Sequence, residues 1–149
     1  MECLDASVVV KWFKANEQYT NEAYALYSRA KKNGSRYVVN EWLILEVVRG
    51  LAKTSVPKEN LKETYSILKH MYASDIIRLV TVSEVLESAK DLEIELNLHA
   101  ADAVHLATAI RTGSAILWTE DEHLHKKSVL EYAGKRGVEI RRLKSETTL

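Results

Sequence analysis

The sequence has few of the residues that build disulfide frameworks, linkers or membrane spans. Its 149 residues include one cysteine, one proline and five glycines. A single cysteine, Cys3, excludes an internal disulfide and a zinc site made from several cysteines. No stretch reaches the roughly 18 apolar residues of a membrane span, and no basic segment precedes an apolar run as in a signal peptide. We therefore expect a single cytoplasmic domain over residues 1–149, with no membrane as a partner.

The chain also lacks a net charge, because its 21 basic residues equal its 21 acidic residues. This balance neither indicates nor excludes a nucleic-acid partner. If four acids were gathered around cations, 21 basic residues would face 17 acids and leave a formal charge of +4. Small basic clusters such as Lys126–Lys127 and Arg141–Arg142 permit contact with a phosphate backbone, although they also fit an ordinary solvated surface.

Short apolar strands alternate with helical patterns along the chain. Strands are predicted at residues 2–5, 37–39, 76–80, 115–118 and 138–140. Helices are predicted at residues 6–14, 21–32, from a cap at Asn40 to about residue 53, 58–72, from Thr81 or Ser83 to about residue 96, 99–111 and 120–133. The alternation predicts an α/β fold, a three-layer α/β/α sandwich around a parallel sheet of about five short strands with right-handed crossovers.

Ligands of such folds bind outside the carboxyl ends of the strands, so acidic residues at those positions are candidates for a site. Asp5 interrupts the apolar run 3–10, where a carboxylate is seldom buried without a partner. It could instead cap the following turn through its own backbone. Glu46 has apolar neighbours at every helical phase. An ion pair with Arg49 would be worth only a few tenths of a kcal/mol and would not explain that setting.

Two further acids lie near the starts of later helices. Asp102 could complement the helix dipole, but the alanines around it indicate close packing in a crowded interior. Asp121 follows the strand at 115–118, where Thr119 to Glu122 fits a capping box. Each of these two acids alone therefore has an ordinary structural explanation.

Together, the four acids predict a metal site. Four carboxylates at one edge of a sheet could not all stay ionised without cations, and an all-oxygen site suits Mg²⁺ or Mn²⁺. Two such ions roughly 4 Å apart form the site with which nucleases hydrolyse phosphodiesters. We predict Asp5 as the bridging ligand, with Glu46, Asp102 and Asp121 completing the site directly or through water.

The acidic motifs, in this order, resemble those of the PIN domain, and at this length the chain is similar to the VapC-type toxins of prokaryotic toxin–antitoxin pairs. The resemblance covers Leu4 to about Ile140. It is carried by Leu4–Ser7 before Lys11–Phe13, Glu46 before Val47, Val48 and Leu51, Asp102–Ala109, and Leu117–Asp121.

The resemblance implies a metal-dependent endoribonuclease that hydrolyses RNA, usually a homodimer, held inactive by a small antitoxin protein in its active-site groove. It also implies that Ser7 and Thr119 support the site through hydrogen bonds. Many relatives carry another acid or an asparagine two residues after the last aspartate, and here that position is His123. A neutral histidine ligates Mn²⁺ but is a poorer partner for Mg²⁺.

Two other functions remain open. The chain could be a catalytically weak PIN-like module that binds RNA or protein and positions one ion. A phospho-acceptor receiver domain shares the element order and an early aspartate, but it needs a pair of acids at the first strand, which Glu2 and Asp5 match poorly. The histidines form no zinc motif, and we interpret His105 as a helix-packing residue.

Overall fold

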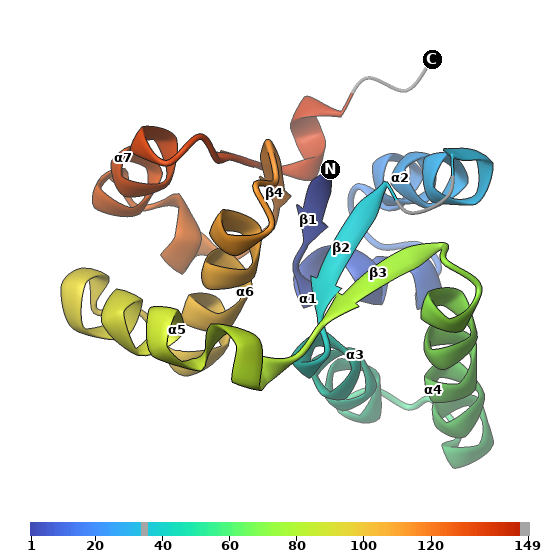
Figure 1. The fold of residues 1–149 in the computed structure, drawn as a ribbon. Coiled ribbons are helices and arrows are strands. Elements are labelled where there is room, and N and C mark those ends of the chain that lie inside the picture. The colour runs from blue at the N-terminus through green and yellow to red at the C-terminus, as the bar shows by residue number, and fades with distance from the viewer. Residues whose placement is uncertain (34–35, 147–149) are drawn as a thin grey trace.

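A five-stranded sheet with helices on both faces is the framework of the computed structural model, which describes residues 1–33 and 36–146 (Figure 1). The strands are β1 (Glu2–Leu4), β2 (Tyr37–Asn40), β3 (Ile77–Val80), β4 (Ile116–Trp118) and β5 (Glu139–Arg141). Their order is β3-β2-β1-β4-β5, and every neighbouring pair is parallel. The predicted parallel α/β/α sandwich is confirmed.

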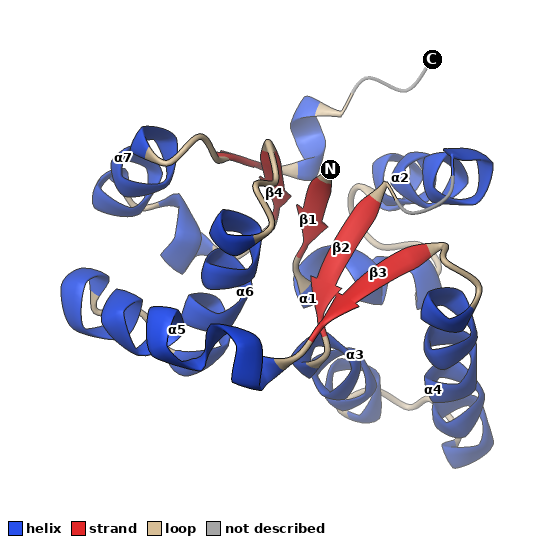
Figure 2. Ribbon diagram, viewed as in Figure 1, coloured by secondary structure: helices blue, strands red, loops and turns tan. Residues whose placement is uncertain are grey.

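In the described part of the chain, seven α-helices cover this sheet in two layers (Figure 2). The helices are α1 (Ala6–Val9), α2 (Thr20–Asn33), α3 (Trp42–Ala52), α4 (Lys58–Ala73), α5 (Val82–Leu96), α6 (Ala100–Arg111) and α7 (Lys127–Lys135). In Figure 1, α1 to α4 lie on one side of the strands and α5 to α7 on the other. Within the described residues, no helix combines the length and the apolar composition needed to cross a membrane.

Two hydrophobic cores form because successive strand side chains point to opposite faces of a sheet. Cys3 and Val38 pack in the core beneath α5, α6 and α7. The next residues along the same strands, Leu4 and Val39, pack in the core beneath α1 to α4. Both faces are buried at the central strands, which is the usual setting of a parallel sheet and accounts for their apolar residues Cys3–Leu4 and Tyr37–Val39.

The register of the two central strands positions the candidate site. Leu4 of β1 pairs with Trp118 of β4, so the residues that follow the two strands, Asp5 and Thr119, are neighbours at the carboxyl edge. The Asp5 backbone N–H donates to the Trp118 carbonyl at 3.0 Å, which extends the pairing by one step.

Two helix starts were predicted from capping residues, and the first lies one residue later than expected, because Glu41 rather than Asn40 is the N-cap of α3. The Asn40 side-chain oxygen accepts the Trp42 N–H at 2.9 Å at the start of α3. Thr81, rather than Ser83, is the N-cap of α5, in a capping box completed by Glu84.

Two predicted helices differ from the observed ones. The helix expected over residues 6–14 becomes a 3₁₀ turn at Val10–Phe13 after the four residues of α1. The helix expected over residues 120–133 is divided into a 3₁₀ turn at Glu122–His125 and α7, with Lys126 extended between them. The predicted Thr119–Glu122 capping box is wrong, because Asp121 caps the turn and the Thr119 hydroxyl donates to Asp5 instead.

Candidate metal centre

Asp5 lies directly after the central strand and is held by three hydrogen bonds. Its Oδ1 accepts the Ala6 N–H at 2.6 Å. Its Oδ2 accepts the hydroxyls of Ser7, at 2.9 Å, and of Thr119, at 2.6 Å. The residue is only 4% exposed. Asp5 therefore caps the following turn through its Oδ1, and it is also a buried carboxylate with hydrogen-bond partners.

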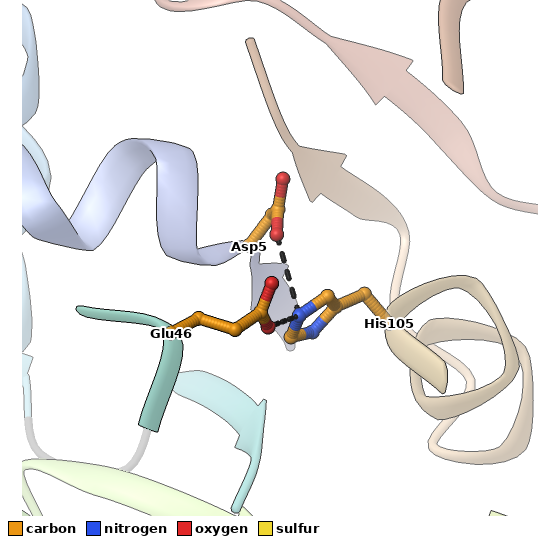
Figure 3. A group of neighbouring side chains, drawn as sticks. All are labelled: Asp5, Glu46 and His105. Carbon is orange, nitrogen blue, oxygen red and sulfur yellow. Dashed lines mark hydrogen bonds and ion pairs between the residues drawn. The ribbon is translucent and has the colours of Figure 1, made fainter. Parts of the chain in front are cut away.

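Glu46 from α3 and His105 from α6 converge on Asp5 (Figure 3). His105 Nε2 lies 3.3 Å from Asp5 Oδ1 and forms a close contact with Glu46 Oε1. Each of the three residues offers a ligand atom, and these atoms all lie within 4.8 Å of one another. The structure thus brings two of the four predicted acids together and adds a histidine to them.

The His105 ring has the environment of a buried cation. Burial alone lowers the pKa of this imidazole, but the Asp5 charge and the contact with Glu46 outweigh it and raise the pKa above its ordinary value. The ring is fully buried. Its other nitrogen, Nδ1, is buried and has no hydrogen-bond partner among the described residues.

Asp102 and Asp121 form a second acidic pair beside the first group. Asp102 lies in the first turn of α6 and is 6% exposed, and Asp121 follows β4. Burial, followed by the charge of Asp121 and a hydrogen bond with it, raises the pKa of Asp102 to about 7. The Asp5 charge contributes in the same direction. Without a cation, the pair shares one proton, as two closely placed carboxyls do.

Of the three predicted supporting residues, Thr119 contacts both groups, Ser7 contacts Asp5, and His123 contacts Asp121. The Thr119 hydroxyl donates to Asp5 and accepts the Asp121 N–H at 3.0 Å, so it contacts both groups. The Ser7 hydroxyl donates to Asp5 and accepts the Glu120 N–H at 2.9 Å. His123 donates its backbone N–H to Asp121 Oδ1 at 2.8 Å.

The His123 side chain has different neighbours from those of His105. Its ring lies 5.2 Å from the His99 ring, measured between centroids, and its residue is exposed. In the described part of the chain, the group of close ligand atoms is made by Asp5, Glu46 and His105, without His123.

Sequence reasoning missed the place of His105 in this site. The residue is buried in α6, as a packing residue would be, but its Nε2 contacts two of the predicted acids. Its interpretation as a packing residue alone was therefore wrong. The available signal was its spacing from Asp102, because helical residues three apart lie on the same face.

The donor set fits a divalent ion that prefers oxygen ligands. Four carboxylates and one imidazole suit Mg²⁺ or Mn²⁺, whereas a soft ion would require thiolates. Cys3 is buried, and its pKa is raised by burial, so it offers no thiolate. The raised pKa values of Asp102 and His105 both favour protonation, which offsets part of the negative charge that a cation would otherwise offset.

Comparisons with known proteins show which family and which folds the chain resembles. A model of the PIN domain matches residues 3–130. The toxin VapC20 of Mycobacterium tuberculosis, described as cleaving the sarcin-ricin loop, is 15% identical over 81% of this chain and 90% of its own, with a TM-score of 0.66. FitAB bound to an IR36 DNA fragment is 14% identical over 99% of both chains, with a TM-score of 0.67.

A third solved structure is VapBC2 of Rickettsia felis bound to a DNA fragment from its promoter. It is 15% identical over 95% of this chain and 97% of its own, with a TM-score of 0.61. At these identities the likeness shows the fold alone. A comparison with curated proteins gave no match.

Proposed function

The chain belongs to the PIN domain family, and we propose that it is a metal-dependent endoribonuclease, the toxin component of a toxin–antitoxin pair. The observation that carries this proposal is the setting of Asp5. This buried carboxylate is oriented by three hydrogen bonds at the end of the central strand. Glu46 belongs to the same group of ligand atoms, and the Asp102–Asp121 pair lies beside that group.

The four acids, Asp5, Glu46, Asp102 and Asp121, are the proposed ligands for Mg²⁺ or Mn²⁺, in a mechanism that uses two ions. When bound, such ions lower the pKa of an attacking water and stabilise the leaving oxygen of a phosphodiester. The chain contributes orientation, because the Ser7 and Thr119 hydroxyls hold Asp5 from one side.

The proposed partners are a small antitoxin protein and a second copy of the chain, and the proposed compartment is the cytoplasm. Support comes from the similar structures, of which one is described as a toxin–antitoxin complex from Klebsiella pneumoniae. We also propose that residues 1–149 act as one nuclease domain. Light scattering of the purified chain tests the homodimer, and copurification with the product of a short neighbouring reading frame tests the antitoxin.

The decisive experiment is RNA cleavage by the wild-type chain and by the Asp5→Asn variant. We expect cleavage of single-stranded or structured RNA with Mn²⁺ or Mg²⁺, and its loss on chelation. Misplacing a catalytic group by 1 Å already costs roughly 10²-fold in rate, so removing the Asp5 charge should cost at least as much. Asp91→Asn makes the same chemical change at an exposed position on α5, and it should leave cleavage unchanged.

The alternative is a catalytically weak PIN-like module that binds RNA or protein. One observation favours it, namely that the His105 imidazolium can neutralise Asp5 and Glu46 without any metal. This alternative replaces the nuclease if neither ion supports cleavage and if Asp5→Asn does not relieve growth arrest on expression.

A further inference from the structure

The position of His105 at the metal-binding acids points to a role in ion selection. We propose that His105 Nε2 is a direct nitrogen ligand of one ion held by Asp5 and Glu46, and that this nitrogen makes the site prefer Mn²⁺ to Mg²⁺. This inference rests on the proposed function, because it presumes that Asp5 and Glu46 bind a divalent cation. It adds to the carboxylate set a ligand that sequence reasoning had assigned to packing.

The spacing of the three ligand atoms fits a single ion. Around an octahedral ion with ligands at about 2.1 Å, adjacent ligand atoms lie roughly 3.0 Å apart and opposite ones roughly 4.2 Å apart. His105 Nε2 and Asp5 Oδ1 are separated by 3.3 Å, and one atom from each of the three residues falls within 4.8 Å of the others. An ion between Glu46 and His105 would replace their direct contact.

The surroundings of the three side chains hold this arrangement. Asp5 is oriented by the Ser7 and Thr119 hydroxyls, and His105 is fully buried within α6. Glu46 is the adjustable member, because its side chain retains 28% exposure. A rigid aspartate and histidine with one movable glutamate form a site that an ion can enter from the side of α3.

The His105 ring faces the acids through one of its nitrogens. Nε2 contacts Asp5 and Glu46, whereas Nδ1 is buried and has no hydrogen-bond partner within the described ranges. Ligation through Nε2 therefore breaks no hydrogen bond on the other side of the ring.

The chemical type of the ligand atom determines which ion binds more tightly. Mg²⁺ retains oxygen ligands and water and gains little from an imidazole, while first-row transition ions accept imidazole readily. Losing an outer-shell partner typically costs roughly 10- to 100-fold in metal affinity. We therefore expect a true ligand such as His105 to contribute at least a tenfold preference for Mn²⁺.

The test is pulsed electron paramagnetic resonance of the wild-type chain loaded with Mn²⁺. A directly bound imidazole gives a ¹⁴N modulation that changes to the ¹⁵N pattern when the protein is made with ¹⁵N-histidine. We expect this modulation in the wild type and in His123→Ala, which removes the histidine two residues after Asp121. We expect its loss in His105→Gln, together with a fall of at least roughly tenfold in the ratio of Mn²⁺ to Mg²⁺ affinity measured by calorimetry.

Each other result overturns the inference in a distinguishable way. Stoichiometric Mn²⁺ that Asp5→Asn removes, but that shows no histidine modulation in the wild type, leaves the nuclease proposal intact and refutes the ligand. Modulation that persists in His105→Gln and disappears in His123→Ala transfers the ligand to His123. If the wild type binds neither ion and cuts no RNA, the proposed function itself fails. The wild-type spectrum decides even if circular dichroism shows that His105→Gln does not fold.

Discussion

Replacing Asp102 by asparagine should stabilise the metal-free protein while it removes a proposed metal ligand. Asp102 is 6% exposed and shares a proton with Asp121, and its pKa is raised from 3.8 to about 7. Between these two pH values the folded chain holds a proton that the unfolded chain has already lost. Stability therefore falls as the pH rises from about 4 to about 7. Asparagine has no such proton to lose, and its amide can still donate to Asp121.

The size of the effect follows from the pKa difference. A rise from 3.8 to about 7, at 1.36 kcal/mol per unit, corresponds to about 4 kcal/mol lost above pH 7. Relaxation of the folded chain around a buried charge makes the realised difference smaller than this value. We therefore expect Asp102→Asn to be about 2–4 kcal/mol more stable than the wild type at pH 8, and nearly equal to it at pH 4.

Urea denaturation at several pH values, with a chelator present, measures this difference directly. Subtracting the two curves removes most of the contribution of His105, whose raised pKa also makes stability fall as the pH rises through that pKa, because the Asp102 charge is the smallest of the causes of that shift. Asp91→Asn, at an exposed position, controls for the loss of one negative charge. Equal unfolding free energies at pH 8, or a lower value for Asp102→Asn, would refute the reasoning. Saturating Mn²⁺ should reverse the order, because a cation favours the ionised carboxyl.

Three further predictions concern the same edge of the sheet and its support. Thr119→Val removes the 2.6 Å hydrogen bond to Asp5 and should cost about 1–3 kcal/mol of unfolding free energy, whereas Thr119→Ser should retain most of it. Trp118→Phe removes the indole N–H that donates to the buried Glu2 carboxylate at 3.0 Å, so its melting temperature should fall by an amount equivalent to about 1–3 kcal/mol. Because the proton on Asp102, with its pKa of about 7, must leave before a cation binds, calorimetry should find Mn²⁺ affinity about tenfold higher at pH 8 than at pH 6, and a pH-independent affinity would contradict this.

The architecture could be predicted from the sequence because local and tertiary preferences agree along the strands. The segment Tyr37–Asn40 is apolar on both sides, and a strand of that kind is stable only between two layers of helices. The capping signals at Asn40 and Thr81 also agree with the helices that follow them. Agreement of this sort lets short patterns define element order without knowledge of distant contacts.

The segment after β4 could not be predicted in the same way, because a residue distant in the sequence binds the side chain that would otherwise cap the helix. Thr119 and Glu122 have the spacing of a capping box, and locally that pattern predicts a continuous helix. In the fold, the Thr119 hydroxyl donates to Asp5, which lies 114 residues earlier. Asp121 then caps a short turn in its place. Only the pairing of β1 with β4 brings the competing acceptor within reach.

The same limit applies to His105. Its spacing from Asp102 places the two residues on one face of α6. The sequence alone does not show which other element packs against that face. The packing of α6 across the carboxyl edge from α3 brings its Nε2 to Glu46. The positions of the acids relative to the predicted strands therefore indicated a cluster. The division of this cluster into two groups, and the presence of a histidine in one of them, depended on the tertiary fold.

The charge of Asp5 is the feature that its structural role leaves unexplained. As the N-cap of α1 it accepts the Ala6 N–H, and an asparagine caps a helix about as well as an aspartate. A turn at this position therefore requires an oxygen but no charge. After burial and Asp121, the Asp5 charge contributes to the raised pKa of the neighbouring Asp102, and it also raises the pKa of His105 against the effect of burial. We account for an aspartate rather than an asparagine at this position by the proposed binding of a cation, because the capping geometry also orients the carboxylate.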